Sequence, residues 1–372
     1  MRGARVEVDL RAIADNVAVL AKRAGSNSAL LAVVKANAYG HGAIEVAQAA
    51  LEAGAQWLAV ATLSEGEAVR HAGILAPMLV LGHVRPDEYA SAAHHNISVA
   101  VSNAQAVADA ERAAAEEGRT LNVQLKLDTG MGRIGARPED APEVARAIAS
   151  APHLRFEGMY THLSSADSDP AYTERQIARY TGTMEQLQRA GLLPPWRHIL
   201  NSAGILTVGH VPGTNMVRGG IAMYGLNPDG VSAPPPGLKP ALSLHAAITF
   251  VKRVPQGTPI GYGQTYLTDR VQQIATLGLG YADGYSRSLS NRGRVLVGGQ
   301  SWPLIGRVSM DQITVGIDPD FPVQIGDDAV LLGRQGDEEI TAEEIARLLG
   351  TINYEVVTGL SPRLPRTYPV QN

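Results

Sequence analysis

The stretch that decides the fold lies between residues 29 and 102, where four short apolar runs alternate with helical segments. The runs are ALLAVVKA (29–36), WLAVAT (57–62), MLVLGH (78–83) and ISVAVS (97–102). The segments AIEVAQAALEAG and NAQAVADAERAAAEEG, which follow the first and the last run, have helical apolar spacing and end at glycine, as many helices do. Strands that alternate with helices predict a parallel sheet with crossover connections.

Four more runs continue this alternation: LNVQLKLD (121–128), FEGMYTH (156–162), RHILNS (197–202) and MVRGGIAMYG (216–225). Eight strand–helix units in about 200 residues predict an α/β fold of the (β/α)8 TIM-barrel type. A doubly wound sheet is the competing arrangement. It is disfavoured because the count reaches eight and because no G-x-G-x-x-G fingerprint follows the first run.

The pattern changes after a proline-rich segment, NPDGVSAPPPGLKP (227–240), which cannot continue a helix and is interpreted as an interdomain linker. Beyond it, short alternating strands with glycine turns predict a mostly β C-terminal domain over residues 241–372. The barrel is expected over residues 1–230, although residues 1–9 could instead pair with the second domain.

Composition narrows the class of protein. The 372 residues carry a net charge of -4 and no basic tract, so neither nucleic acid nor a membrane surface is an expected partner. No apolar run approaches the roughly 18 residues of a membrane-spanning helix, and the charged N-terminus is not a signal peptide. The absence of cysteine excludes disulfides and cysteine-based catalysis. A cytoplasmic enzyme or binding protein is expected.

Polar residues follow the predicted strand ends, where barrel enzymes place their active sites. The first predicted strand ends in Lys35, and burial there would lower its pKa and free the amine to join pyridoxal phosphate. A surface or ion-paired lysine is the alternative. The segments NSAG (201–204) and RGGIAMYG (218–225) offer a hydroxyl and small residues that would let backbone amides approach a phosphate.

Other candidate residues have two interpretations each on spacing alone. Arg218 either forms a structural ion pair or faces a cofactor nitrogen, and His162 is either a core histidine or part of the site. Tyrosines in the glycine-flanked loops GYGQTY (261–266) and GYADGY (280–285) either pack or reach a site, and a cationic neighbourhood can turn a tyrosine into a base. No metal-ligand motif or P-loop is present, so no metal is expected.

Eight motifs, in order over nearly the whole chain, together resemble the alanine racemase family. They are AVVKANAYGHG around Lys35, KLDTGMGRIG around Arg133, YTHLSSAD around His162, NMVRGGIAMYG around Arg218, GYGQTY, GYADGY, GRVSMDQ and TINYEVV. The resemblance implies a homodimer in which each active site lies at a barrel mouth and is completed by the C-terminal domain of the partner. The implied function is interconversion of L-alanine and D-alanine by two-base proton transfer on a pyridoxal-phosphate aldimine, which supplies D-alanine for peptidoglycan in a bacterium.

The resemblance also assigns roles to residues. Pyridoxal 5'-phosphate is expected on Lys35, with its pyridine nitrogen at Arg218. Its phosphate is expected to contact Tyr39, Ser202, the backbone of Gly220 and Ile221, and Tyr354. The substrate carboxylate is expected at Arg133 and the backbone of Met310, with Tyr281 at the entry. Lys126 matches a lysine that is carbamylated in some members of the family.

The catalytic roles follow from the need to remove the α-proton on one face and return a proton on the other. Lys35 is expected to serve the D-enantiomer, and Tyr262 of the second subunit the L-enantiomer. His162 and Arg218 are expected to form a hydrogen-bonded cationic chain that helps Tyr262 to ionise.

Three rival functions remain open on the sequence. A related pyridoxal-phosphate decarboxylase typically carries an acidic residue where this chain has Arg218, and it uses a cysteine that this chain lacks. A barrel-only pyridoxal-phosphate binding protein without turnover has no need of the second domain. A broader racemase that acts on serine, lysine or arginine is poorly separated from an alanine racemase by sequence alone. Tyr281 and Tyr354 are nevertheless expected to crowd the pocket and favour a methyl side chain.

Overall fold

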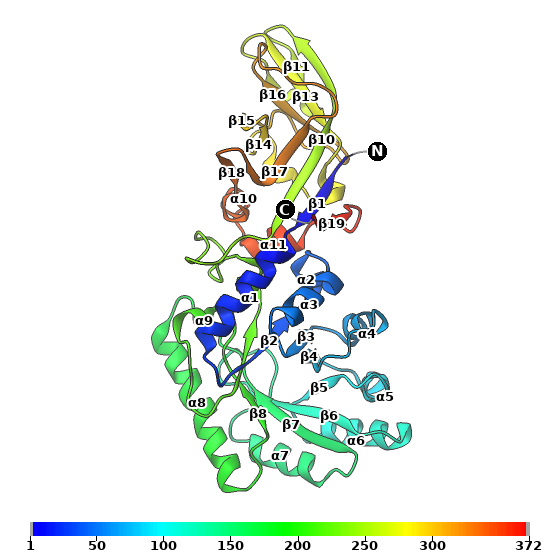
Figure 1. Ribbon diagram of the computed structural model, residues 1–372, viewed down its shortest axis with the longest axis vertical. Coiled ribbons are helices and arrows are strands. Elements are labelled where there is room, and N and C mark those ends of the chain that lie inside the picture. The colour runs from blue at the N-terminus through cyan, green and yellow to red at the C-terminus, as the bar shows by residue number, and fades with distance from the viewer. Residues whose placement is uncertain (1–2, 370–372) are drawn as a thin grey trace.

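Eight parallel strands close into a barrel in the N-terminal part of the chain (Figure 1). The computed structural model describes residues 3–369. Neighbouring strands pair in sequence order, and the last strand pairs with the first. The predicted TIM barrel is confirmed, and the doubly wound alternative is wrong. The strands are β2 (Ala29–Val33), β3 (Trp57–Val60), β4 (Met78–His83), β5 (Ser98–Val101), β6 (Leu121–Lys126), β7 (Leu154–Tyr160), β8 (Trp196–His198) and β9 (Met216–Gly219).

Helices cover the outside of the barrel (Figure 1). Capping residues define their ends: Asn103 accepts a hydrogen bond from the backbone of Ala106 at the start of α6, and Gly118 ends that helix in a left-handed conformation. The barrel helices are α1 (Leu10–Ala24), α2 (Lys35–Tyr39), α3 (Ala43–Glu52), α4 (Leu63–His71), η1 (Pro86–Glu88), α5 (Tyr89–His94), α6 (Ala104–Glu117), α7 (Ala141–Ser150), α8 (Pro170–Arg189), α9 (Ser202–Thr207) and η2 (Ile221–Tyr224).

Some barrel strands are shorter than the apolar runs that predict them. The first strand stops at Val33, so Lys35 does not end a strand but begins the short turn α2. Likewise, the run that starts at Met216 leaves the barrel after Gly219 and continues as η2. An apolar run shows burial, but residues that follow a strand into the barrel mouth are buried as well, so hydrophobicity alone does not mark the strand end.

The C-terminal domain is built around a nine-stranded sheet that lies above the barrel in Figure 1. The long strand β10 pairs with β1, β13 and β17, and β1 also pairs with β19. Residues 5–8 therefore belong to this sheet and not to the barrel. Its strands are β1 (Arg5–Val8), β10 (Leu242–Val254), β13 (Gln272–Leu277), β14 (Arg294–Val297), β15 (Gln300–Pro303), β16 (Ile313–Ile317), β17 (Asp328–Gln335), β18 (Glu338–Ile340) and β19 (Arg366–Thr367).

A two-stranded hairpin and several short helices complete this domain. Figure 1 places the hairpin strand β11 at the end of the molecule that is farthest from the barrel. These elements are β11 (Pro259–Ile260), η3 (Tyr262–Gln264), β12 (Tyr266–Leu267), η4 (Tyr281–Asp283), η5 (Arg287–Leu289), α10 (Ala342–Leu349) and α11 (Asn353–Thr358).

The segment 227–240 contains no helix or strand, but it is packed against both parts of the molecule. The side chain of Asn16, in α1, accepts from the backbone N–H of Lys239 and donates to its carbonyl oxygen (2.9 and 2.8 Å). Asn353, in α11, donates to the carbonyl oxygen of Asn227 (3.0 Å). The expected linker is thus a fixed connection rather than a free tether.

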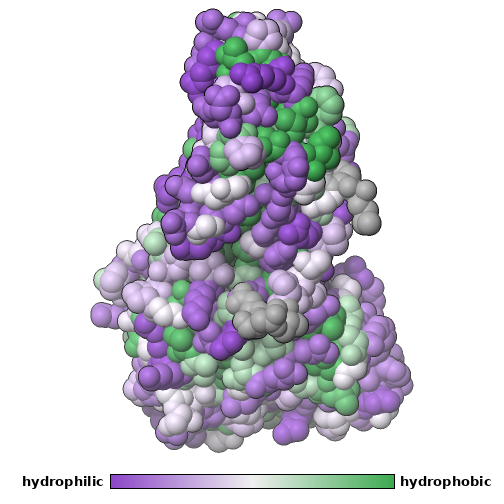
Figure 2. Space-filling view, turned by 45° about the horizontal axis from the view of Figure 1, so that its top comes forward, coloured by the Kyte–Doolittle hydropathy of each residue, from purple (hydrophilic) through white to green (hydrophobic). Residues whose placement is uncertain are grey.

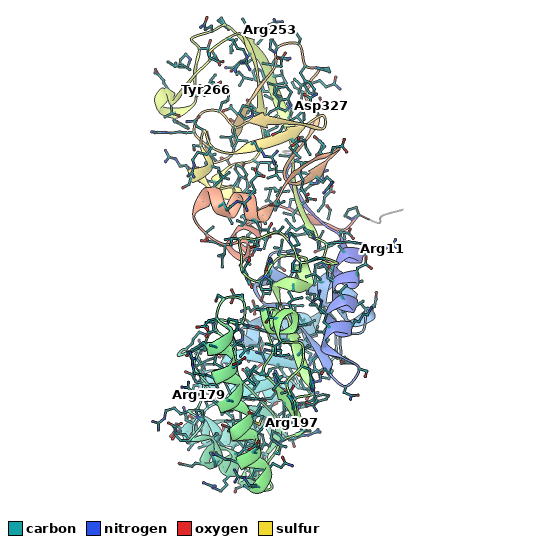
Figure 3. The ribbon with its side chains drawn as sticks, turned by 90° about the vertical axis from the view of Figure 1, so that its left-hand side faces the viewer. Arg11, Arg179, Arg197, Arg253, Tyr266 and Asp327 are labelled. Atoms are coloured by element: carbon teal, nitrogen blue, oxygen red, sulfur yellow. The ribbon has the colours of Figure 1, made fainter. Side chains whose placement is uncertain are left out.

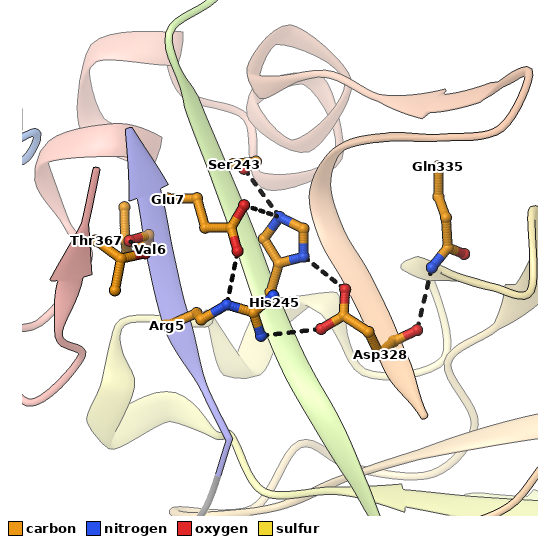
Figure 4. A network of polar contacts seen from close by, with 8 residues as sticks. All are labelled: Arg5, Val6, Glu7, Ser243, His245, Asp328, Gln335 and Thr367. Carbon is orange, nitrogen blue, oxygen red and sulfur yellow. Dashed lines mark hydrogen bonds and ion pairs between the residues drawn. The ribbon is translucent and has the colours of Figure 1, made fainter. Parts of the chain in front are cut away.

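A polar network joins the N-terminal strand to the sheet (Figure 4). Arg5 donates to Glu7 (2.7 Å) and to Asp328 (3.0 Å). His245 Nδ1 lies 2.8 Å from the second oxygen of Asp328, and its Nε2 lies 2.9 Å from Ser243 Oγ. Partial burial acts to raise the pKa of Asp328, but the bonds from His245 and Arg5 outweigh it and leave that pKa below 3.8.

Replacing Asp328 with asparagine should lower the free energy of unfolding by about 1 kcal/mol near neutral pH, because these charge-assisted bonds are partly exposed to solvent. A carboxyl group with a lowered pKa in the fold stabilises the protein above its unfolded pKa, and this contribution disappears as the pH falls through the folded value. The difference between wild type and variant, measured by urea unfolding, should therefore shrink as the pH falls below about 3.8 and vanish only below the lower pKa of the folded state. An equal loss in the exposed control Asp320→Asn, or a difference that does not change with pH, would contradict this account.

Exposed apolar side chains are concentrated in the C-terminal domain, where Figure 2 shows green patches on the upper part of the surface. Of the ten large hydrophobic side chains that are exposed among residues 3–369, eight lie beyond residue 241: Phe250, Tyr262, Leu267, Val271, Tyr281, Met310, Ile325 and Ile352. Apolar side chains that gather on one part of a surface often mark an interaction site. Over the same described residues, no helix is long and apolar enough to cross a membrane.

Candidate active site

A pocket of about 400 Å³ opens at the barrel mouth, between the strand ends and α11. This volume is typical of a small-molecule site. Eight of the thirteen residues predicted for the site line it: Lys35, Tyr39, His162, Ser202, Arg218, Gly220, Ile221 and Tyr354. Arg218 lies in β9 itself, and the others come from the segments after β2, β7, β8 and β9 and from α11.

Lys35 begins a turn with an uncommon backbone. The four residues that follow it, Ala36 to Tyr39, all have φ between 51° and 54°. L-residues avoid this left-handed region, and a run of four costs several kcal/mol (roughly 1–2 kcal/mol for each residue). The N–H groups of Ala38 and Gly40 donate to the carbonyl oxygens of Val34 (2.8 Å) and Ala36 (3.0 Å), so the turn is a short left-handed helix. Such strain persists only where the surroundings enforce it.

The C-terminal domain supplies part of that enforcement. Arg366 donates from Nε to the carbonyl oxygen of Gly40 (3.1 Å), and Tyr368 donates to that of His41 (3.3 Å). Gly40 itself has φ of 85°, and a Cβ atom there would collide with the carbonyl oxygen of Val357. The end of the turn is therefore held between the barrel and the last elements of the chain.

The environment of Lys35 favours a reactive amine. Burial lowers its pKa, the positive charge of Arg133 lowers it further, and Glu65 acts in the opposite direction. Glu65 also accepts from the N–H of Ala36 (2.7 Å), which places its carboxylate beside the start of the turn. A lysine with a lowered pKa carries more of the neutral, nucleophilic form near pH 7.

Ser202, Gly220 and Tyr39 form a cradle at one end of the pocket. The N–H groups of Gly220 and Ala222 point at Ser202 Oγ (2.9 and 3.2 Å). A Cβ atom on Gly220 would lie 3.1 Å from the Tyr39 hydroxyl and 3.4 Å from Ser202 Oγ, so glycine keeps this space open. Burial raises the pKa of Tyr39 to about 12, so its phenol stays protonated and can donate. Backbone amides and hydroxyls that converge in this way suit a phosphate group.

Tyr354 closes the same end of the pocket from α11. Its ring lies 6.2 Å from that of Tyr39, and its hydroxyl donates to the carbonyl oxygen of Pro228 (3.2 Å). Burial raises the pKa of Tyr354 as well, so this hydroxyl is a second neutral donor.

Arg218 is buried in the barrel and points its guanidinium group toward the base of the pocket. Nη2 donates to the carbonyl oxygens of Thr161 (2.8 Å) and Ile199 (3.0 Å), and Nη1 donates to Nδ1 of His198 (2.9 Å). Burial lowers its pKa to about 10, which still leaves it charged near pH 7. Among residues 3–369 no carboxylate forms an ion pair with it, so its positive charge is available to a ligand.

His162 contacts Arg218, but only the arginine is charged. Nη2 of Arg218 lies 3.4 Å from Nδ1 of His162. Burial lowers the pKa of His162 to about 2, helped by the positive charges of Arg218, Lys126, Arg133 and Lys35. The expected hydrogen-bonded pair is present, but it carries one positive charge and not two. Since arginine can only donate, Nδ1 of His162 accepts and Nε2 carries the proton.

From the sequence we did not identify the buried residues that hydrogen-bond to Arg218 or to its partner His198. His198 stacks on Tyr160 at 4.8 Å and donates from Nε2 to Gln124 (2.8 Å), which donates in turn to Glu157 (3.2 Å). All four lie on barrel strands among apolar neighbours and are buried. The available signal was polar side chains inside strongly apolar runs, where an unpaired polar group would be costly.

Lys126 lies inside the barrel near the pocket but does not line it. Its Nζ donates to the carbonyl oxygen of Leu127 (2.7 Å) and lies 5.2 Å from the centre of the Tyr160 ring. Burial lowers its pKa to about 7, and the nearby Arg218 and Arg133 also lower it, while Asp128 raises it. More of the amine is therefore neutral near pH 7 than in an exposed lysine.

The other predicted site residues lie outside the pocket of their own chain. Arg133 is exposed on the loop after β6, close enough to lower the pKa of Lys35. Tyr262, Tyr281 and Met310 belong to the C-terminal domain and are 71%, 41% and 53% exposed. Figure 3 shows Tyr266, which follows Tyr262 in the same hairpin, high on that domain and far from the barrel. One chain does not bring these three residues to Lys35.

The electrostatics favour an anionic organic ligand. Lys35, Lys126, Arg133 and Arg218 are close enough to shift the pKa of His162, and their combined field attracts phosphate and carboxylate groups. Over residues 3–369, no group of three or more His, Cys, Asp or Glu side chains could hold a metal ion. The pocket thus combines a reactive amine, a phosphate cradle and a buried cation.

Comparison with protein families gives two matches that together span most of the chain. The family described as alanine racemase, N-terminal domain, matches residues 8–228. The family described as alanine racemase, C-terminal domain, matches residues 241–368.

Individual proteins are similar over their full length. The alanine racemase of Symbiobacterium thermophilum is 46% identical over 370 residues, which covers 99% of this chain and 97% of that protein. The crystal structure of alanine racemase from E. faecalis superposes with a TM-score of 0.93 at 40% identity, covering 99% of this chain and 98% of the other. The structure from Bacillus anthracis with bound L-Ala-P gives 0.92 at 40% identity, covering 100% and 96%.

Proposed function

Since the chain belongs to the alanine racemase family, it is an isomerase that interconverts L-alanine and D-alanine, and we propose that the barrel pocket is the active site, with pyridoxal 5'-phosphate as its cofactor. The relatives and solved structures named above are alanine racemases, so a broader amino-acid specificity gains no support from them. The observation that carries the proposal is one pocket with Lys35, a phosphate cradle and Arg218.

The residues present fit this cofactor. Gly220 leaves open the space between Tyr39 and Ser202 that a Cβ atom would fill, which suits the phosphate. Lys35 would hold the aldehyde carbon, and Arg218 would donate to the pyridine nitrogen. When bound, pyridoxal phosphate supplies an electron sink that acidifies the α-hydrogen of an attached amino acid.

The protein groups then have to move one proton on each face of the substrate. Lys35 Nζ exchanges a proton with the α-carbon of D-alanine, and Tyr262 Oη of the partner subunit does so with L-alanine. Neutral His162, with its proton on Nε2, serves as a hydrogen-bond relay between Arg218 and Tyr262. Arg133 and the backbone of Met310 of the partner subunit hold the substrate carboxylate.

A second copy of the chain would complete the site. The exposed apolar side chains of the C-terminal domain include Tyr262, Tyr281 and Met310, and a partner barrel would cover them. In such a dimer Tyr281, together with Tyr354, crowds the substrate side chain and favours the methyl group of alanine. From the family we also infer a cytoplasmic enzyme whose D-alanine supplies peptidoglycan synthesis.

The experiment that tests the proposal joins activity to the site of attachment. Purified protein with pyridoxal phosphate should convert L-alanine to the racemic mixture, as followed by chiral chromatography. After reduction with borohydride, peptide mapping should find the pyridoxyl group on Lys35. A colourless protein that gains no activity with added cofactor, or a label on another lysine, would remove this function from the pocket.

Lys126 should carry a carbamate. Its neutral amine can attack CO2, forming an N–C bond and releasing one proton to solvent. The new negative charge would be stabilised by Arg218 and Arg133, which now lower the pKa of the amine. Because only the neutral amine reacts, the carbamate should form above about pH 7 and be lost in acid. Protein equilibrated with ¹³CO2 should show one carbamate carbon signal by NMR. Its absence, or its persistence in Lys126→Met, would rule the modification out.

A further inference from the structure

A small cavity lies between the barrel and the C-terminal domain, apart from the active-site pocket. His41, Tyr224, Thr341 and Glu343 are among the residues that line it. Its volume is about 20 Å³, which is room for one water molecule and nothing larger. Two polar atoms of its lining residues, His41 Nε2 and Glu343 Oε2, are buried and have no hydrogen-bond partner among residues 3–369.

His41 can only accept a hydrogen bond at this cavity. Its Nδ1 lies 3.0 Å from the carbonyl oxygen of Tyr39, so Nδ1 carries the proton and Nε2 carries the lone pair. Burial lowers the pKa of His41 to about 4, and the imidazole is therefore neutral near pH 7. Its ring packs against Tyr224 at 4.5 Å, which fixes the direction of Nε2.

Glu343 also presents an acceptor. Asn353 donates from Nδ2 to Glu343 Oε1 (2.9 Å) and to the carbonyl oxygen of Asn227 (3.0 Å), so one carboxylate oxygen is satisfied and held. The other, Oε2, has no partner in the described part of the chain. Two acceptors at one cavity need a molecule that can donate twice. Water does this, whereas a cation would need more ligands than these two side chains provide.

We propose that one ordered water molecule binds in this cavity and donates one hydrogen to His41 Nε2 and the other to Glu343 Oε2. The water ties the strained turn to the C-terminal domain, because His41 follows that turn and donates to its last residue, Tyr39. It adds to the hydrogen bonds that Arg366 and Tyr368 donate to the backbone of the same segment. His41 is thus a positioning residue for the turn between Lys35 and Tyr39.

A crystal structure of the holoenzyme at a resolution that shows single waters tests the site directly. We expect one peak within hydrogen-bond distance of both His41 Nε2 and Glu343 Oε2, about 2.7–3.2 Å from each. An empty cavity, a water that reaches only one of the two atoms, or a direct contact between the two side chains overturns the proposal. This outcome does not depend on whether the protein racemises alanine.

Hydrogen exchange of the backbone amides in residues 36–42 tests the role of the water. His41→Phe keeps the ring but loses both polar contacts, and it should exchange at least about tenfold faster, the effect of one lost buried hydrogen bond. His41→Gln places an amide near the position of Nε2, whereas His41→Asn places one near Nδ1. Slow exchange should therefore return in His41→Gln and not in His41→Asn.

The exposed His210→Phe is the matched control and should exchange at the wild-type rate in this segment. Wild-type protection in His41→Phe, or recovery in His41→Asn, shows that the turn does not depend on the water and overturns its role. If His41→Phe does not fold, the crystal structure and the comparison of His41→Gln with His41→Asn still decide the proposal.

Discussion

Lys35→Ala should lower the rate of racemisation by at least about 10⁴-fold, because one change removes both the attachment point of the cofactor and one of the two proton carriers. The variant should also lose the visible absorption of covalently bound cofactor, while the phosphate cradle at Ser202 and Gly220 still binds it noncovalently. The matched control is Lys22→Ala, which removes an exposed lysine of α1 and should leave the rate unchanged.

The two readouts for Lys35 separate catalysis from folding. A stable variant with intact cofactor binding but without activity supports the assignment. A variant that retains a tenth of the wild-type rate would show that another lysine carries the chemistry. Within residues 3–369, Lys126 is the other lysine close enough to lower the pKa of His162, and its own pKa of about 7 makes it the group to examine in that case.

Tyr262→Phe should lower the racemisation rate by about 10²- to 10⁴-fold, the range of one general base. The equilibrium constant fixes the ratio of kcat/KM for the two directions, so a variant loses the same factor in both. Rates alone therefore do not show which enantiomer the tyrosine serves, but isotope effects do. With the tyrosine step slow, α-deuterated L-alanine should show a large primary isotope effect and α-deuterated D-alanine a small one. In D2O the variant should exchange the α-hydrogen of D-alanine faster than it racemises.

Tyr266→Phe is the matched control for this hairpin, since its hydroxyl contacts only Gln272 among the described residues and should not affect the isotope effects. Equal isotope effects for the two enantiomers in Tyr262→Phe would show that Lys35 and Tyr262 do not each exchange a proton with only one enantiomer.

Much of the barrel could be predicted from its sequence because burial and periodicity are local properties. Each of the eight apolar runs contains or overlaps one barrel strand, and the polar residues just after them gather at one pocket. Local patterns did not show where a strand ends. Lys35 lies beyond β2 because four residues adopt a left-handed turn, and that conformation depends on contacts with Val357, Arg366 and Tyr368 at the other end of the chain.

Two other parts of the site could not be placed from the residues of one chain, each for a different physical reason. His198 and Gln124 contact Arg218 directly or through one another inside the barrel; their polar side chains in apolar runs indicate buried hydrogen bonds, but the runs do not show which partners they bond. Tyr262 lies outside the pocket that Lys35 lines, so one chain does not bring the two together; the role proposed for Tyr262 rests on the family resemblance and on a proposed second copy of the chain.

The most direct test of a shared active site mixes two variants that each have little activity. Lys35→Ala and Tyr262→Phe subunits are denatured together, refolded and assayed with pyridoxal phosphate. If each site takes Lys35 from one subunit and Tyr262 from the other, every hybrid dimer regains one intact site, and random reassortment should restore about a quarter of the wild-type activity. A mixture that remains as inactive as its two parents, although hybrids are present by mass spectrometry, would show that both groups act within one chain.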